Sequence, residues 1–199
     1  MNTTTRIFLA GFLGGVVMLI WLTVAHMVSP LGQVGFDNMP NDEVTRPALA
    51  ASMGARPGMY GFPAMDMQLA AKDMGASMKA YEEKTRAGPS GFVIYHPAGQ
   101  PLNMGMGALQ EFLKLWVVAT IAAFLLAEAS TQLSYGARVG FVAAIGAIAS
   151  LSTNVSYRAW YGFPGDYTAA AIFMEFVGYV LGGLVLAWFA RAPAKPPVT

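Results

Sequence analysis

The sequence predicts an all-α integral membrane protein: a four-helix bundle with an irregular, partly helical extracytoplasmic cap. Hydrophobic residues make up 55% of the 199 residues, and charged residues only 12%, whereas soluble domains carry about 25% charged residues. Four long stretches are almost free of charge, and most charges and prolines lie in one segment, residues 29–107. This division predicts lipid as the solvent for four segments and water for the fifth.

Residues 1–28 contain the first predicted span. Its stretch 7–28 carries no formal charge, and at about 1.5 Å per residue it can cross a hydrocarbon core of about 30 Å. Arg6 precedes this stretch, as a basic residue precedes the apolar part of a signal peptide. The apolar run exceeds the roughly 7–15 residues of that part, and no A-x-A cleavage site follows it. A retained span is therefore favoured over a cleaved signal.

Three further spans are predicted within residues 108–191, at about 109–128, 139–157 and 167–190. Glu111 and Lys114 stand at the start of the second span, and Glu175 is the single charge inside the fourth. The connections between these spans are short, at residues 129–138 and 158–166. Residues 192–199 form a proline-rich tail.

The insert, residues 29–107, is too polar and too often interrupted by proline to span a membrane. Two short helices are expected in it. One begins at Asn41, a favourable N-cap residue, and the other covers residues 65–86 before Gly88 and Pro89 stop it. The insert has few large aliphatic residues, so we expect only a small core of its own.

The distribution of Lys and Arg predicts the orientation. Arg6, Arg138, Arg191 and Lys195 fall on one side of a four-span bundle, and Arg158 falls on the other. Both termini are therefore expected in the cytoplasm, and residues 29–107 outside it. Aromatic residues, which favour the membrane interface, gather at the outer end: Trp160, Tyr161, Phe163 and Tyr167.

Small residues at helical spacing mark candidate packing faces, because they let membrane helices approach closely. Gly11 and Gly15 form a G-x-x-x-G pair in the first span, and Gly178 and Gly182 form another in the fourth. The third span has a comparable series, Gly140, Ala144 and Ala147. Packing within this bundle is the favoured interpretation, and docking against another subunit is the alternative.

Polar residues at membrane depth are candidate functional groups because their burial in lipid is costly. Six lie in the outer half of the predicted spans: His26, Glu111, Lys114, Asn154, Arg158 and Glu175. Lys114 and Glu175 fall at nearly the same depth, so we expect them to form an ion pair. A structural ion pair, a pocket for a small ligand or quinone headgroup, and a proton path are the three interpretations, in that order of preference.

Methionine is concentrated in the insert, which holds two M-x-M pairs, Met65/Met67 and Met104/Met106. Thioethers bind Cu(I), and His96 is a further candidate ligand. Methionine is also a flexible packing residue, so packing is favoured over a metal site. The chain has no cysteine, which excludes disulfides and thiolate metal sites. No cofactor is predicted.

No P-loop, dinucleotide fingerprint, zinc-protease motif or nucleophile elbow occurs. We therefore predict no catalytic residue, and an enzyme is disfavoured. The net charge is only +1, and the sequence has no cluster of basic residues of the kind that forms the face of a nucleic-acid-binding protein. The leading hypothesis is a non-enzymatic accessory or structural subunit that packs against a larger membrane complex. A small-ligand or quinone-binding membrane protein is the alternative, and periplasmic copper handling through the Met-rich insert is the third.

Several segments resemble a group of bacterial four-span membrane proteins that have no assigned activity. They include Pro30-Leu31-Gly32, Met39-Pro40-Asn41-Asp42, the stretch from Gly58 to Pro63, the stretch from Tyr95 to Gly99 and the stretch from Ser156 to Pro164. The resemblance covers nearly the whole chain. It implies the span–insert–three-span layout and a bacterial inner-membrane location, and it transfers no functional residue.

Overall fold

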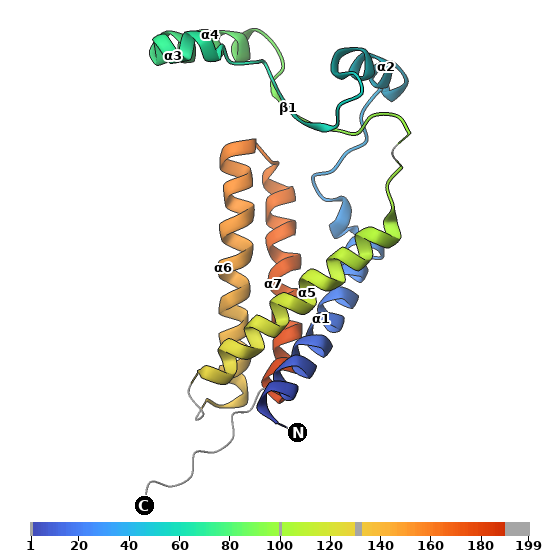
Figure 1. Ribbon diagram of the computed structural model, residues 1–199, viewed down its shortest axis with the longest axis vertical. Coiled ribbons are helices and arrows are strands. Elements are labelled where there is room, and N and C mark those ends of the chain that lie inside the picture. The colour runs from blue at the N-terminus through green and yellow to red at the C-terminus, as the bar shows by residue number, and fades with distance from the viewer. Residues whose placement is uncertain (1, 100, 130–132, 190–199) are drawn as a thin grey trace, which may run out of the picture. The chain divides into compact units, whose positions relative to one another are not determined.

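The computed structural model describes residues 2–99, 101–129 and 133–189, and these are mostly helical (Figure 1). The predicted tail and Ala190, the last residue of the fourth predicted span, lie outside the described residues. The elements in chain order are α1 (Thr3–Met27), η1 (Pro30–Gln33), α2 (Asp42–Met53), β1 (Gly58–Phe62), α3 (Met67–Lys72), α4 (Met74–Ala87), β2 (Gly91–Tyr95), α5 (Met104–Glu128), α6 (Tyr135–Tyr161) and α7 (Gly165–Phe189).

Four of these helices, α1, α5, α6 and α7, are long and apolar enough to cross a membrane, as the sequence predicted. They have 25 to 27 residues each. Three of them begin at side-chain N-caps ahead of the apolar stretch. The side chains of Asn2, Asn103 and Ser134 accept hydrogen bonds from the backbone N–H groups three residues on. These caps explain why the helices begin before the predicted spans.

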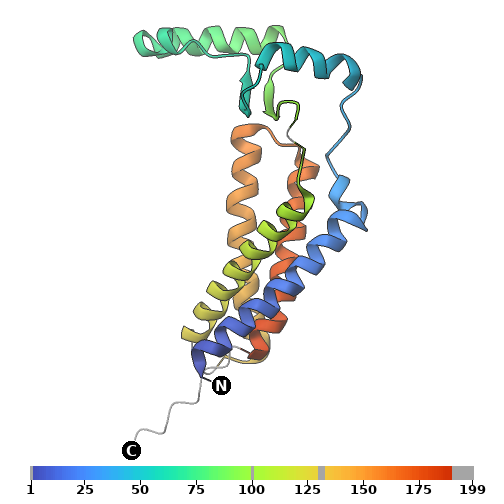
Figure 2. The ribbon, with the colours of Figure 1, turned by 45° about the vertical axis from the view of Figure 1, so that its right-hand side comes forward.

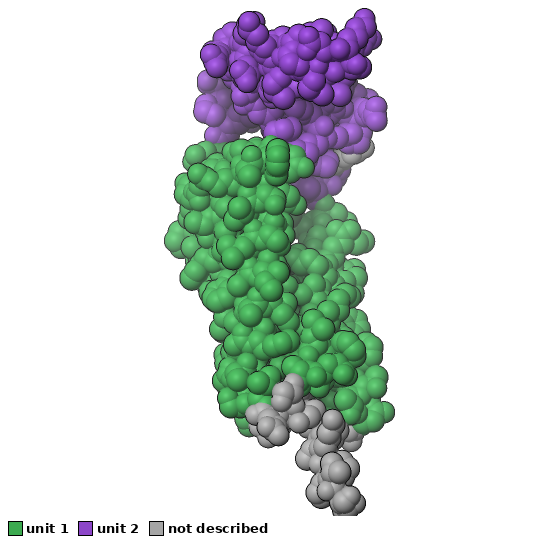
Figure 3. Space-filling view, turned by 90° about the vertical axis from the view of Figure 1, so that its left-hand side faces the viewer, with its two compact units in different colours: residues 1–37, 103–199 green, residues 38–102 purple. Residues whose placement is uncertain are grey.

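The chain divides into two compact units, Met1–Asp37 with Asn103–Thr199, and Asn38–Leu102 (Figure 3). The first unit contains the four long helices. Helix α1 packs along both α5 and α7, and α6 packs along α7, whereas α5 has few contacts with α6 or α7. Figures 1 and 2 show α1 and α5 side by side, with α5 inclined to the α6–α7 pair.

Glycines allow α1 to lie against its two neighbours. A Cβ atom added at Gly15 would lie 2.9 Å from the Cα atom of Trp116 in α5, and one at Gly11 would overlap Thr120. On the α7 side, a Cβ at Gly182 would lie 2.9 Å from Cγ of Met18. Both G-x-x-x-G pairs of the sequence therefore lie at contacts inside the bundle, where backbones or side chains meet closely.

Helix α6 uses different small residues from those that the sequence analysis singled out. Gly146 lies under the side chain of Tyr179, and Val142 packs against Gly183 of α7. Gly140 has no neighbouring atom within 4 Å of an added Cβ, and Ala144 is exposed. No described residue of the chain thus covers the Gly140–Ala144 face, contrary to the favoured interpretation of packing within the bundle.

The first unit has a core rich in alanine, as expected where helices approach closely. Ala10, Ala119, Ala122 and Ala123 are at most 2% exposed, and Leu186 is 1% exposed. Polar side chains also join α1 to α7. The indole nitrogen Nε1 of Trp21 donates to the carbonyl of Met174 (2.8 Å), and the Arg6 guanidinium donates to the carbonyl of Phe189 (2.9 Å).

The second unit has little core. Its buried residues are Ala70, Ser77 and Tyr95, while many of its methionines and several larger hydrophobic residues are exposed. An unpredicted antiparallel ribbon pairs β1 with β2, with Gly58 opposite Tyr95 and Phe62 opposite Gly91. The Tyr95 hydroxyl donates to the carbonyl of Gly54 at the end of α2 (2.9 Å). Polar contacts of this kind supplement the small apolar core.

The helix predicted at residues 65–86 is divided into α3 and α4 at Asp73. This residue has an extended backbone (φ −149°, ψ 98°) and its side chain caps α4 by accepting from Ala76 N at 3.0 Å. Aspartate favours such caps over helix interiors. Asn41 does stand at the N-cap of α2, but in the left-handed conformation and without a side-chain capping hydrogen bond.

We predict that Gly15→Ala destabilises the protein by about 1–3 kcal/mol, because the added Cβ meets the backbone of α5 at Trp116. Gly140→Ala is the matched control. Its Cβ meets open space, so it should leave the stability unchanged or raise it by up to about 1 kcal/mol through helix propensity. Denaturation of the purified protein in mild detergent measures both. Equal losses would show that the close α1–α5 approach is not a stability determinant.

Candidate functional site

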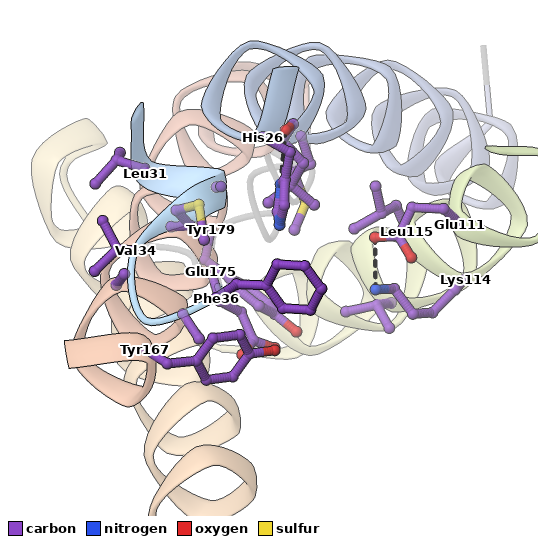
Figure 4. A pocket seen from close by; sticks show the side chains of 18 residues that line it. His26, Leu31, Val34, Phe36, Glu111, Lys114, Leu115, Tyr167, Glu175 and Tyr179 are labelled. Atoms are coloured by element: carbon purple, nitrogen blue, oxygen red, sulfur yellow. Dashed lines mark hydrogen bonds and ion pairs between the residues drawn. The ribbon is translucent and has the colours of Figure 1, made fainter. Parts of the chain in front are cut away.

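A cavity of about 520 Å³ lies in the first unit, at the end of the long helices where α1 finishes and α5 and α7 begin (Figure 4). It is walled by α1, α5, α7 and the segment 31–36. Its lining is mainly apolar: Met18, Leu22, Leu31, Gly32, Val34, Phe36, Leu115, Val118, Ala170, Ala171, Met174 and Gly178. Its polar lining residues are His26, Glu111, Lys114, Tyr167, Glu175 and Tyr179.

The segment after α1 covers part of this cavity because two glycines let it fold back. Gly32 lies against the backbone of His26. A Cβ atom added at Gly32 would lie 2.7 Å from the Cα atom of His26. Gly35 adopts a left-handed conformation (φ +70°), and a Cβ there would lie 2.7 Å from the backbone nitrogen of Tyr167. This path places Leu31, Val34 and Phe36 in the cavity wall.

Glu111 and Lys114 form an ion pair on α5. Nζ of Lys114 lies 2.7 Å from Oε1 of Glu111, and the side chains are 57% and 37% exposed respectively. The two residues are three positions apart, so they lie on one helix face. Each neutralises the other at the edge of the cavity.

Glu175 lies on α7 and is held by a neutral partner on α6. Nδ2 of Asn154 donates to Oε2 of Glu175 (3.1 Å) and to the carbonyl of Ser150 (2.9 Å). Among the described residues, no Lys, Arg or His lies within ion-pair distance of the Glu175 carboxylate. The half-buried carboxylate therefore reaches the cavity without a protein cation beside it.

His26 and Tyr179 complete the polar lining. Nδ1 of His26 lies 2.9 Å from the carbonyl of Leu22, so a neutral ring places its proton on Nδ1 and leaves Nε2 as an acceptor. Tyr179 lies one helical turn after Glu175 and is 6% exposed. Its hydroxyl makes no hydrogen bond with any described residue.

The predicted ion pair between Lys114 and Glu175 is wrong. The two residues line the same cavity, but Lys114 pairs with Glu111 instead. The physical reason is local: Glu111 is already on the same helix face, whereas α5 and α7 have few mutual contacts. Figure 4 shows the Glu111–Lys114 pair apart from Glu175, which lies with Phe36 and Tyr167.

The structure brings five of the six predicted polar residues to this site. His26, Glu111, Lys114 and Glu175 line the cavity. Asn154 does not line it but donates a hydrogen bond to Glu175 from α6. Arg158 does not line it, and its guanidinium lies against Gly165 at the α6–α7 connection. Phe36 and Tyr179 were missed, because an aromatic residue in an apolar sequence carries no signal that distinguishes a cavity wall from a lipid-facing position.

The candidate copper ligands are divided between the two units. Met65, Met67 and His96 belong to the second unit, while Met104 and Met106 belong to the first. Within the second unit, His96 lines a groove with Arg46 and Tyr95 that neither Met65 nor Met67 lines. No described residues form a group of three His, Asp or Glu side chains suited to a metal ion.

No protein-family model matches the chain, and no curated protein or solved structure matches it significantly.

We predict that Asn154 and Glu175 are energetically coupled and that Lys114 and Glu175 are not. Asn154→Leu alone leaves a half-buried carboxylate without its donor, which should cost about 1–3 kcal/mol. The double variant with Glu175→Leu should recover part of that loss. Lys114→Met combined with Glu175→Leu should give additive losses. Unfolding of all variants in detergent measures the two coupling energies, and the opposite pattern would restore the Lys114–Glu175 pair.

Proposed function

We propose that this chain is a membrane protein that binds a small amphipathic molecule in the cavity between α1, α5 and α7. The observation that carries the proposal is the convergence of polar side chains from three helices on one largely apolar cavity. Its volume, about 520 Å³, falls in the range of roughly 300–1,000 Å³ that is usual for small-molecule sites. An apolar wall with few polar groups suits a ligand that has a polar head and an apolar body.

The roles of the residues follow from their surroundings. Glu175 and Nε2 of His26 offer acceptors, and the Tyr179 hydroxyl offers a donor or an acceptor. Met18, Leu22 and Leu115 receive the apolar body. A quinone headgroup is one such ligand. None of these groups forms a nucleophile–base pair, so we propose binding rather than catalysis.

The arrangement of glycines favours this function over an accessory subunit. If docking were the main role, small-residue faces should turn outward. Instead, Gly11, Gly15 and Gly182 lie at contacts within the bundle. The open Gly140–Ala144 face of α6 favours the second candidate function, an accessory subunit that packs against another membrane protein through α6.

The proposed topology places the four long helices across a bacterial inner membrane, with both termini in the cytoplasm and the insert outside. It rests on the Lys and Arg distribution and on the four apolar helices. The cavity then lies in the outer half of the bilayer, where a lipophilic molecule can reach it from the lipid.

We predict that the purified protein retains a bound amphipathic molecule that Ala171→Trp displaces. Ala171 lines the cavity, so an indole there fills part of its volume. Ala169→Trp is the matched control, because Ala169 is an exposed residue of α7 that does not line the cavity. Native mass spectrometry and solvent extraction after purification in mild detergent measure occupancy.

Loss of the bound molecule in Ala171→Trp but not in Ala169→Trp would support the binding function. Equal retention in the two variants would contradict it. A protein that copurifies in stoichiometric amount, and that is lost when Gly140 is replaced by Trp, would instead establish the accessory-subunit function.

We predict that a reporter active only outside the cytoplasm is active when inserted near Ala70 and silent when fused to the C-terminus. The physical reason is the excess of Lys and Arg at the other ends of the long helices. Enzyme activity of the two fusions in whole cells measures it. The reverse pattern, or activity at both positions, would overturn the topology.

A further inference from the structure

We infer that the molecule bound in this cavity carries a positively charged ammonium group that lies against Glu175. This inference rests on the proposed binding function and adds the charge of the ligand. It is argued from three features of the site: a carboxylate that no Lys or Arg of the described chain offsets, aromatic residues in the lining, and a lining hydroxyl without a partner among the described residues.

The carboxylate of Glu175 has no cation of the described chain to neutralise it. Its hydrogen-bond partner is the neutral amide of Asn154, at 3.1 Å. Lys114 is engaged by Glu111 at 2.7 Å, and the guanidinium of Arg158 lies against Gly165. Among the Asp, Glu, Lys and Arg side chains of the lining, there are therefore two carboxylates and one cation. A charged group removed from water requires a partner, and a cationic ligand supplies it.

Three aromatic residues line the same cavity as Glu175, namely Phe36, Tyr167 and Tyr179. In Figure 4, Phe36 and Tyr167 lie with Glu175 on one side of the cavity, and Tyr179 follows Glu175 by one turn of α7. The faces of aromatic rings attract an ammonium group. Aromatic residues in a lining that also holds a carboxylate thus suit a cation.

The Tyr179 hydroxyl is the third feature. Tyr179 is 6% exposed, lines the cavity and makes no hydrogen bond with a described residue. The oxygen of a hydroxyl that lines a cavity can accept from an ammonium N–H. An anionic headgroup would face Glu175 without a free cation to receive it. The apolar lining from Met18, Leu22 and Leu115 accommodates the hydrocarbon part of the ligand.

Two sources offer this chemistry, namely a free lipophilic amine and the amine of a phospholipid headgroup. Three water-soluble probes share a phenylbutyl body and differ in the charge of their end group: 4-phenylbutylamine, 4-phenylbutanol and 4-phenylbutanoate. Comparing their affinities separates the effect of ligand charge from that of apolar burial. Their affinities are measured at neutral pH by calorimetry on the full-length protein in a neutral maltoside detergent. Phosphatidylethanolamine is then added as mixed micelles in the same detergent, with phosphatidylglycerol as reference. Competition by phosphatidylethanolamine alone indicates the lipid headgroup as the source, and no competition by either lipid indicates a free amine.

We expect the amine to bind wild-type protein at least about tenfold more tightly than the alcohol, since bonds to charged groups are the stronger ones. Glu175→Gln, which keeps an acceptor for Asn154, should remove this preference and leave the alcohol bound. Glu128→Gln is the matched control outside the cavity and should change nothing. Lys114→Met should keep the preference or increase it, because it removes a cation from the lining.

Equal affinities of amine and alcohol, or an amine preference that survives Glu175→Gln, would overturn the ammonium inference and leave the binding function intact. Ala171→Trp should weaken all three probes. If no probe binds the wild type, or if Ala171→Trp changes no affinity, the binding function fails and the inference fails with it.

Discussion

The first unit depends on the close approach of α1 to its two neighbours. Gly11 and Gly15 bring the α5 backbone near at Thr120 and Trp116, and Gly14 admits the side chain of Leu186 from α7. In a lipid environment, for which these helices are long and apolar enough, apolar residues would gain little by leaving lipid for protein, and close van der Waals packing would hold the bundle together. The absence of a Cβ at these positions is therefore a structural requirement, and α1 becomes the helix on which α5 and α7 both pack.

The cavity follows from this arrangement. Because α5 and α7 both pack on α1 while making few contacts with each other, side chains of all three helices line one space at the end of the bundle. Segment 31–36 closes part of it through the turns at Gly32 and Gly35. The same separation explains the charges, since Lys114 meets Glu111 on its own helix and Glu175 keeps only the Asn154 amide.

The second unit is organised by different forces. It buries few residues, and hydrogen bonds at turns and caps supply much of its order, as at Asp66, Asp73 and Tyr95. Composition predicted the small core, and Asn41 marked the start of α2 correctly. The β1–β2 ribbon escaped prediction because two five-residue strands that contain glycine carry little periodic signal, and their pairing joins residues 29 to 37 positions apart.

The sequence by itself determined the four long helices, because runs of uncharged residues need only length and composition to be recognised. It also identified His26, Glu111, Lys114, Asn154 and Glu175 as notable, because polar residues in apolar runs stand out. Only the tertiary structure decided which of these residues meet, which glycines face inward, and that Phe36 and Tyr179 join the site. Helical periodicity gives the residues that share a face, but the neighbour of that face depends on crossing angles and backbone separations, which the combined packing of all the helices sets.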